Sequence, residues 1–155
     1  MSRLIVISNR VAVATGELSK ARGGLAMALT AALRDCGGLW FGWSGKRTDE
    51  FTGHIDFNRE DGVTTATIDL EDQDIEEYYN GYANRTLWPL FHYRIDLAEF
   101  ERDFAGGYQR ANLRFAETVL PLIEGDDAVW VQDYHMIPLG EELRRLPQAV
   151  AARPG

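Results

Sequence analysis

The chain has 155 residues, of which 45% are hydrophobic and 26% are charged, a composition typical of a soluble globular domain. Its net charge is −8 and it has no basic patch, which excludes the usual nucleic-acid-binding proteins. No stretch approaches the ~20 apolar residues that span a bilayer. The single Cys36 cannot form an internal disulfide, so we expect a cytoplasmic protein.

The first half of the chain predicts strands separated by a helix and a loop. In chain order we expect a strand at 3–8, a helix from Gly24 ending at Gly37-Gly38, a strand at 39–43, a polar loop over 45–62 with a weak strand near 54–57, and a strand at 63–68. The run at 3–8 is almost wholly apolar, as in strands that are covered on both faces of a parallel sheet. Three leucines recur every four residues after Gly24 and give one helical stripe.

The second half predicts helices around one more strand. We expect a helix over 69–84, an interruption at 88–92, a helix over 104–123 bent near Pro121, a strand at 128–132, a helix over 138–146 and a loop over 149–155. Pro89 should end the first of these helices, because proline disfavours helical geometry in the residue before it. Strands that alternate with helices predict an α/β fold, a doubly wound, Rossmann-like parallel sheet with flanking helices. The final loop leads to no further strand, so we expect a chain cut inside a domain.

Polar residues follow two of the predicted strands directly. Arg10 follows the first strand, and Asp133 and His135 follow the strand at 128–132. In open α/β sheets ligands bind beyond the carboxyl ends of the strands, so these side chains should face one crevice. The forked charge of Arg10 suits phosphate, and Gly23-Gly24 would open a helix with bare N–H groups that an anion can approach. The polar segment at 11–21 between them is then a candidate lid.

Each of these residues also has a purely structural interpretation. Arg10 could form a surface ion pair, Gly23-Gly24 could be a simple turn, and Asp133 could cap the next helix. Neither the dinucleotide nor the Walker glycine fingerprint is present. The three histidines lack metal-ligand spacing, so no metal site is expected.

Aromatic residues lie beside polar or loop residues at several positions. They are Trp40, Trp43, Tyr78, Tyr79, Tyr82, Trp88, Phe91, His92 and Tyr93. Aromatic faces next to hydrogen-bonding groups suit a sugar, whereas the alternative is a core of large side chains. The two interpretations are balanced for Tyr79 and Trp88, and core is favoured for Trp130.

Together these stretches resemble the trehalose-6-phosphate synthase family of retaining glycosyltransferases, family 20. The segments that carry the resemblance, in family order, are SNR (8–10), RGGLA (22–26), GLWFGWSG (38–45), EEYYNGYANRTLWPLFHYR (76–94) and WVQDYHMIP (130–138). The resemblance implies a GT-B fold of two Rossmann-like domains facing each other across a cleft. Residues 1–155 would be part of the N-terminal, acceptor-side domain. The family's histidine-proline motif and its C-terminal donor-nucleotide domain are absent from this chain.

The resemblance also implies a reaction, in which glucose passes from UDP-glucose to glucose 6-phosphate with retention and gives trehalose 6-phosphate and UDP. Arg10 would bind the acceptor phosphate, and Tyr79 and Trp88 the acceptor sugar. Gly23-Gly24 would approach the donor, and Asp133 would contact the acceptor near the reacting oxygen as the candidate catalytic residue. No metal or other cofactor is implied.

Two alternatives stay open from the sequence. The chain could be an inactive fragment or a sugar-phosphate-binding module, and by itself we expect it to be inactive. A related synthase could instead use another phosphorylated acceptor, such as glycerol 3-phosphate. The sequence does not decide whether the protein forms a homo-oligomer.

Overall fold

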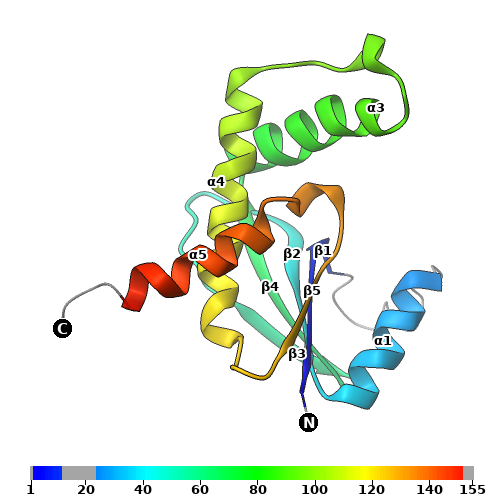
Figure 1. The fold of residues 1–155 in the computed structure, drawn as a ribbon, viewed down its shortest axis with the longest axis vertical. Helices are drawn as coiled ribbons and strands as arrows, with labels where there is room; N and C mark the ends of the chain where they lie inside the picture. Colours follow the sequence, from blue (N-terminus) through cyan, green and yellow to red (C-terminus); the bar gives the residue numbers. More distant parts are fainter. Residues whose placement is uncertain (1, 12–23, 152–155) are drawn as a thin grey trace.

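The computed structural model describes residues 2–11 and 24–151 and contains a five-stranded sheet in the order β3-β4-β2-β1-β5 (Figure 1). The strands are β1 (Leu4–Arg10), β2 (Leu39–Thr48), β3 (Asp56–Glu60), β4 (Val63–Glu71) and β5 (Ala128–Val131). β4, β2, β1 and β5 are mutually parallel, and only β3 runs antiparallel, to β4. The predicted α/β fold with a mainly parallel sheet is therefore confirmed.

β3 is longer than the weak strand expected near residues 54–57. It continues to Glu60 and returns as β4 through Asp61 and Gly62, whose φ values are +52° and +78°. Asp-Gly with both residues at positive φ forms the tight turn that matches the twist of a hairpin. The sequence carried this signal inside the segment that was predicted to be mainly loop.

Helical segments account for most of the remaining described residues. They are α1 (Gly24–Cys36), α2 (Asp72–Asp74), the π-helix η1 (Ile75–Leu87), α3 (Trp88–Phe91), the 3-10 turn η2 (Ile95–Leu97), α4 (Arg102–Val119), the 3-10 turns η3 (Leu120–Leu122) and η4 (Tyr134–Met136), and α5 (Leu139–Ala151). α1 begins and ends as predicted, with Gly37 at φ +64° after its last residue. No helix in the described part of the chain is long and apolar enough to cross a membrane.

The sheet is covered on both faces. Ile5 and Ile7 of β1 belong to the larger core, which also contains buried side chains of η1, α4 and α5. Val6, between them, belongs to a smaller core with Leu29 and Leu33 of α1. Figure 1 shows α1 on one side of the sheet and α4 and α5 on the other. This alternation explains why the sequence of β1 is apolar at nearly every position.

Several expectations from the sequence are wrong. β2 continues to Thr48, inside the expected loop over 45–62, and β4 continues to Glu71, although a helix was expected from residue 69. Trp88 keeps helical angles (φ −57°, ψ −50°), so the chain stays helical from Asp72 through Pro89 to Phe91. Pro89 lies in the first turn of α3, where a missing N–H costs little. α5 continues to Ala151, three residues into the expected loop. Trp130 is 48% exposed rather than part of the core, because β5 is an edge strand.

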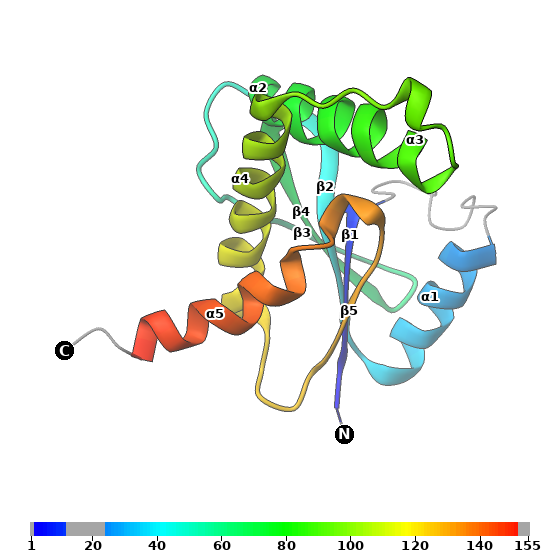
Figure 2. The ribbon, with the colours of Figure 1, turned by 45° about the horizontal axis from the view of Figure 1, so that its top comes forward.

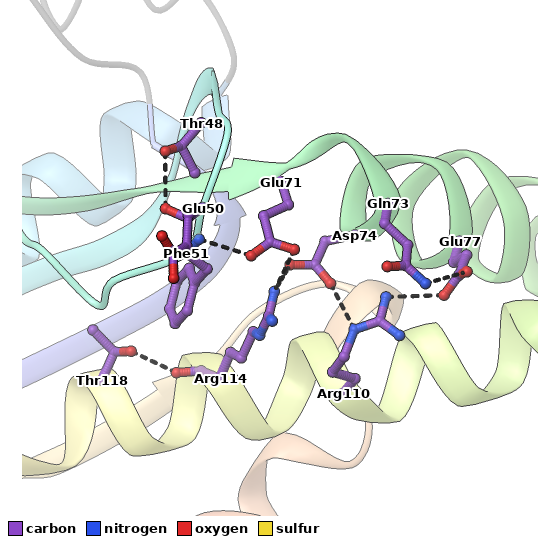
Figure 3. A network of polar contacts seen from close by, with 10 residues as sticks. All are labelled: Thr48, Glu50, Phe51, Glu71, Gln73, Asp74, Glu77, Arg110, Arg114 and Thr118. Carbon is purple, nitrogen blue, oxygen red and sulfur yellow. Dashed lines mark hydrogen bonds and ion pairs between the residues drawn. The ribbon is translucent and has the colours of Figure 1, made fainter.

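A buried charge cluster fixes α4 against the start of the long helix (Figure 3). The carboxylate of Asp74, with a fully buried side chain, accepts hydrogen bonds from Arg110, at 2.9 Å, and from Arg114. Arg110 also donates to Glu77 at 2.9 Å. Because both arginines belong to α4, the cluster sets where η1 begins and hence where the side chains that follow point.

Candidate functional site

The first element of the site is an irregularity at the end of β1. Ile7 pairs with Phe41 and Arg10 with Trp43, so two residues of β1, Ser8 and Asn9, oppose Gly42 alone. A side chain at position 42 would place its Cβ 2.5 Å from the carbonyl oxygen of Ser8, which is closer than atoms allow. Such a bulge redirects the side chains that follow it.

Arg10 leaves this bulge as an exposed side chain. Its guanidinium carbon lies 5.9 Å from the ring centroid of Trp43, within range of a cation–π contact. A Cβ at Gly45 would approach Arg10 Nη2 to 2.6 Å, so the backbone there leaves room for the guanidinium. Arg10 makes no ion pair with any residue of the described chain. Among those residues the surface ion-pair interpretation of Arg10 therefore finds no support.

Asp133 lies next to this bulge at the end of the neighbouring strand. The amide of Gln132 donates to the carbonyl of Ile7 at 2.7 Å, which continues the β1–β5 ladder up to Asp133. Asp133 Oδ2 accepts a hydrogen bond from the amide of Asn9 at 3.2 Å. The carboxylate makes no capping bond to η4, so the capping interpretation is not what the structure shows.

The backbone of Asp133 is strained. Its φ of +85° and ψ of +145° lie in a region that glycine occupies readily and other residues rarely. Holding a non-glycine residue there costs of order 1–3 kcal/mol, and such strain is concentrated at binding and catalytic sites. In this strained conformation the carboxylate of Asp133 is exposed to solvent.

Arg10 and Trp88 are the two ends of one row of touching side chains, which we call the aromatic row. Its members in order are Arg10, Trp43, Tyr79, His135, Tyr134 and Trp88. The ring-centroid distances along it are 5.6 Å (Trp43–Tyr79), 5.4 Å (Tyr79–His135), 4.3 Å (His135–Tyr134) and 5.5 Å (Tyr134–Trp88). In Figure 2 the helix that supplies Tyr79 and Trp88 crosses above the carboxyl ends of the strands. Four segments far apart in the sequence thus meet at the carboxyl ends of the strands.

Tyr79 and Trp88 differ in exposure. Tyr79 is half-buried, with its ring against the edge of Trp43 and parallel to His135 at 15°. Trp88 is 49% exposed and packs on Tyr134 and on His92, whose ring centroid is 3.9 Å away. Tyr79 therefore packs against the core and is also part of the aromatic row. Trp88 is exposed enough for a sugar to stack on its ring.

His135 is the buried centre of the row. It is 8% exposed, and within residues 2–11 and 24–151 neither ring nitrogen has a hydrogen-bond partner. Burial disfavours the charged imidazolium and lowers the pKa of His135 below its usual value, although the nearby Asp133 opposes this shift. The imidazole is therefore uncharged at neutral pH, and its ring stacks on Tyr79 and on Tyr134.

The structure adds Asn9 to the sequence-predicted site, and it brings Trp43, one of the aromatic residues noted in the sequence, next to Arg10. Asn9 was not singled out because a polar residue after an apolar strand has no distinctive pattern, and only the bulge turns it inward. Gly24 is the first residue of α1, whereas Gly23 and residues 12–21 of the lid expected over 11–21 lie outside the described residues. Among residues 2–11 and 24–151, no three His, Cys, Asp or Glu side chains gather as metal ligands would.

The sequence model of glycosyltransferase family 20 matches residues 2–151. The chain belongs to glycosyltransferase family 20. A curated relative from Klebsiella pneumoniae, named trehalose-6-phosphate synthase, is 47% identical over 145 residues, which are 94% of this chain and 30% of the relative. This member of family 20 thus spans about 30% of the length of the curated relatives that it matches.

Solved structures of longer proteins superpose closely on this family 20 chain. An α,α-trehalose-phosphate synthase (UDP-forming) from Burkholderia vietnamiensis is 45% identical with a TM-score of 0.89, over 95% of this chain and 31% of that one. An Escherichia coli protein bound with UDP-2-fluoro glucose is 43% identical with a TM-score of 0.84, over 94% and 30%. The synthase from Burkholderia xenovorans in complex with glucose-6-phosphate is 43% identical with a TM-score of 0.81, over 94% and 31%.

Proposed function

We propose that this chain is the acceptor-side part of a retaining glucosyltransferase that makes trehalose 6-phosphate and UDP from UDP-glucose and glucose 6-phosphate. Residues 1–155 would form part of its N-terminal Rossmann-like domain, and a donor-nucleotide domain would belong to the longer protein. The relatives' names support this reaction, as do the glucose-6-phosphate and UDP-2-fluoro glucose in two similar structures. The single free Cys36 is consistent with a reducing cytoplasm, where we place the reaction.

The observation that carries the proposal is that Arg10 and Trp88 lie along one row of rings, with Asp133 hydrogen-bonded to the residue before Arg10, at the carboxyl ends of the strands. The guanidinium of Arg10, which forms no ion pair within residues 2–11 and 24–151, suits the acceptor phosphate because it can bind two phosphate oxygens at once. The half-exposed Trp88 provides a face for the C–H surface of a sugar, and the carboxylate of Asp133 accepts a hydroxyl hydrogen. Phosphate, sugar face and hydroxyl are the three recognisable parts of glucose 6-phosphate.

In the proposed reaction, the anomeric hydroxyl oxygen of glucose 6-phosphate attacks C1 of the donor glucose on the face that the diphosphate leaves. The C1–O bond to the diphosphate breaks as the new C1–O bond forms, and the departing diphosphate takes the hydroxyl proton. The work left for the protein is to orient two sugars and to stabilise the charge that develops on the diphosphate. Asp133 would orient the acceptor, and the backbone N–H groups at Gly24, the first residue of α1, would face the diphosphate.

The experiment that tests the proposal is product analysis with the full protein that contains this chain. UDP-glucose and glucose 6-phosphate should yield equal amounts of UDP and a phosphorylated non-reducing disaccharide. UDP release without that disaccharide would contradict the proposal. Glycerol 3-phosphate in place of glucose 6-phosphate distinguishes the alternative acceptor, because Arg10 could bind either phosphate.

A second candidate function follows from the 30% coverage of the relatives. The 155-residue chain by itself carries Arg10, Asp133 and Trp88 and would act as a sugar-phosphate-binding module without transferase activity. A calorimetric titration with glucose 6-phosphate should detect weak binding, and glucose serves as the control without phosphate. Measurable glucosyl transfer by the 155-residue chain would contradict this second proposal.

A further inference from the structure

Asn9 occupies the position in the bulge where β1, Asp133 and the long helix meet. It is only 6% exposed. Its backbone N–H donates to Asp133 Oδ2, and its side-chain Oδ1 accepts a buried hydrogen bond of 2.7 Å from the hydroxyl of Tyr78. Asn9 is thus tied to Asp133 on one side and to the residue before Tyr79 on the other.

The bond to Tyr78 fixes the orientation of the Asn9 amide. Burial raises the pKa of Tyr78 well above its ordinary value, so the phenol keeps its proton and donates it to Oδ1. The amide nitrogen Nδ2 must then point away from Tyr78. Among residues 2–11 and 24–151 no hydrogen bond from its two N–H donors is present, and Nδ2 is not one of the buried atoms that lack a partner.

Asp133 has an acceptor oxygen that receives no hydrogen bond from the described residues. Oδ2 is held by the amide of Asn9, whereas Oδ1 receives no hydrogen bond from the described chain. The side-chain donors of Asn9 and the Oδ1 acceptor of Asp133 thus belong to two residues that one hydrogen bond joins, and Arg10 follows Asn9 in the sequence. A sugar hydroxyl both accepts and donates one hydrogen bond, so it matches this pair.

We propose that Asn9 is a further acceptor-binding residue, whose Nδ2 donates to a hydroxyl oxygen of the phosphorylated sugar while that hydroxyl donates to Asp133. The inference rests on the proposed function and deepens it, since it adds a hydrogen bond to a hydroxyl of the sugar rather than to its phosphate. The competing interpretation is structural, with Asn9 serving only to hold Tyr78 in place. The two interpretations differ in which Michaelis constant changes.

The test uses the full protein with Asn9→Ala, Asn9→Asp and Tyr78→Phe as the matched control. Both Asn9 variants should raise KM for glucose 6-phosphate about tenfold, the effect expected from one lost hydrogen bond, and leave KM for UDP-glucose within about twofold. Asn9→Asp keeps an oxygen for Tyr78 to donate to and lacks the Nδ2 donor, so it covers the case in which Asn9→Ala fails to fold. Tyr78→Phe removes the bond that orients the Asn9 amide but keeps the Nδ2 donor, so it should lower stability and raise KM for glucose 6-phosphate less than Asn9→Ala does, by at most about threefold.

Monodeoxy analogues of glucose 6-phosphate identify the hydroxyl. One analogue should bind the unaltered protein weakly and show no further loss with Asn9→Ala, because the contact is already missing. Equal increases in both Michaelis constants, or an acceptor effect of Tyr78→Phe as large as that of Asn9→Ala, would overturn the inference. If the unaltered protein makes no disaccharide, the proposed function fails. Calorimetric titration with glucose 6-phosphate then tests the role of Asn9 separately, and an unchanged affinity in Asn9→Ala would overturn that role.

Discussion

Replacing Asp133 by glycine and by alanine separates the strain of its backbone from the role of its carboxylate. Both changes remove the hydrogen bond from the Asn9 amide, so that loss cancels in the comparison. At an ordinary position alanine is more stable than glycine by about 0.4–1 kcal/mol. At φ +85° and ψ +145° the non-glycine residue costs about 1–3 kcal/mol. The glycine variant should therefore be more stable than the alanine variant by about 1–2 kcal/mol.

Urea unfolding followed by circular dichroism measures this difference. With a denaturant slope of about 2 kcal/mol per molar urea, the midpoint of Asp133→Gly should exceed that of Asp133→Ala by about 0.5–1 M. Both variants should lose affinity for glucose 6-phosphate to the same extent, since both lack the carboxylate. An alanine variant at least as stable as the glycine variant would refute the inference that position 133 stores strain.

Two further predictions concern packing and pH. Asp74→Ala should destabilise the protein by about 3–5 kcal/mol, because it leaves Arg110 and Arg114 partly buried without their shared partner. As a control, Arg145→Ala breaks a pair with Glu142 at the surface and should cost under about 1 kcal/mol in the same urea assay. Equal losses of stability in the two variants would contradict a stabilising role for the buried charge cluster. For His135 the folded-state pKa lies below 6.5, so its contribution to stability is complete above about pH 6.5 and is lost as pH falls through the folded pKa. Unfolding curves between pH 7.5 and pH 5 should show a steeper loss for the unaltered protein than for His135→Phe, and parallel pH profiles would contradict a buried neutral imidazole.

The sequence predicted those parts of the fold that depend on local pattern. The apolar run of β1, the leucine spacing of α1 and the glycine after it need no knowledge of distant residues. The placement of Arg10 and Asp133 at one edge was also predictable, because parallel strands bring their carboxyl ends together. The structure confirms the second point through the hydrogen bond between Asn9 and Asp133.

The features that the sequence did not predict depend on tertiary contacts. Pro89 was expected to end a helix, but it falls in the first turn of α3, where its missing N–H is tolerated. Trp130 was expected in the core because β5 is apolar, and only the strand order shows that β5 is an edge. Asn9 gains its role from a bulge opposite Gly42, which is a matter of register between two strands rather than of either sequence alone.

The most direct test of the acceptor site is the kinetic effect of Arg10→Ala in the full protein. Arg10 has no protein partner for its charge in the described chain. Loss of its charge-assisted hydrogen bonds to phosphate should raise KM for glucose 6-phosphate about 10–100-fold. KM for UDP-glucose should stay within about twofold, and Arg10→Lys should recover part of the loss, because it restores the charge without the fork. Equal increases in the two Michaelis constants would contradict the assignment of this edge of the sheet to the acceptor phosphate.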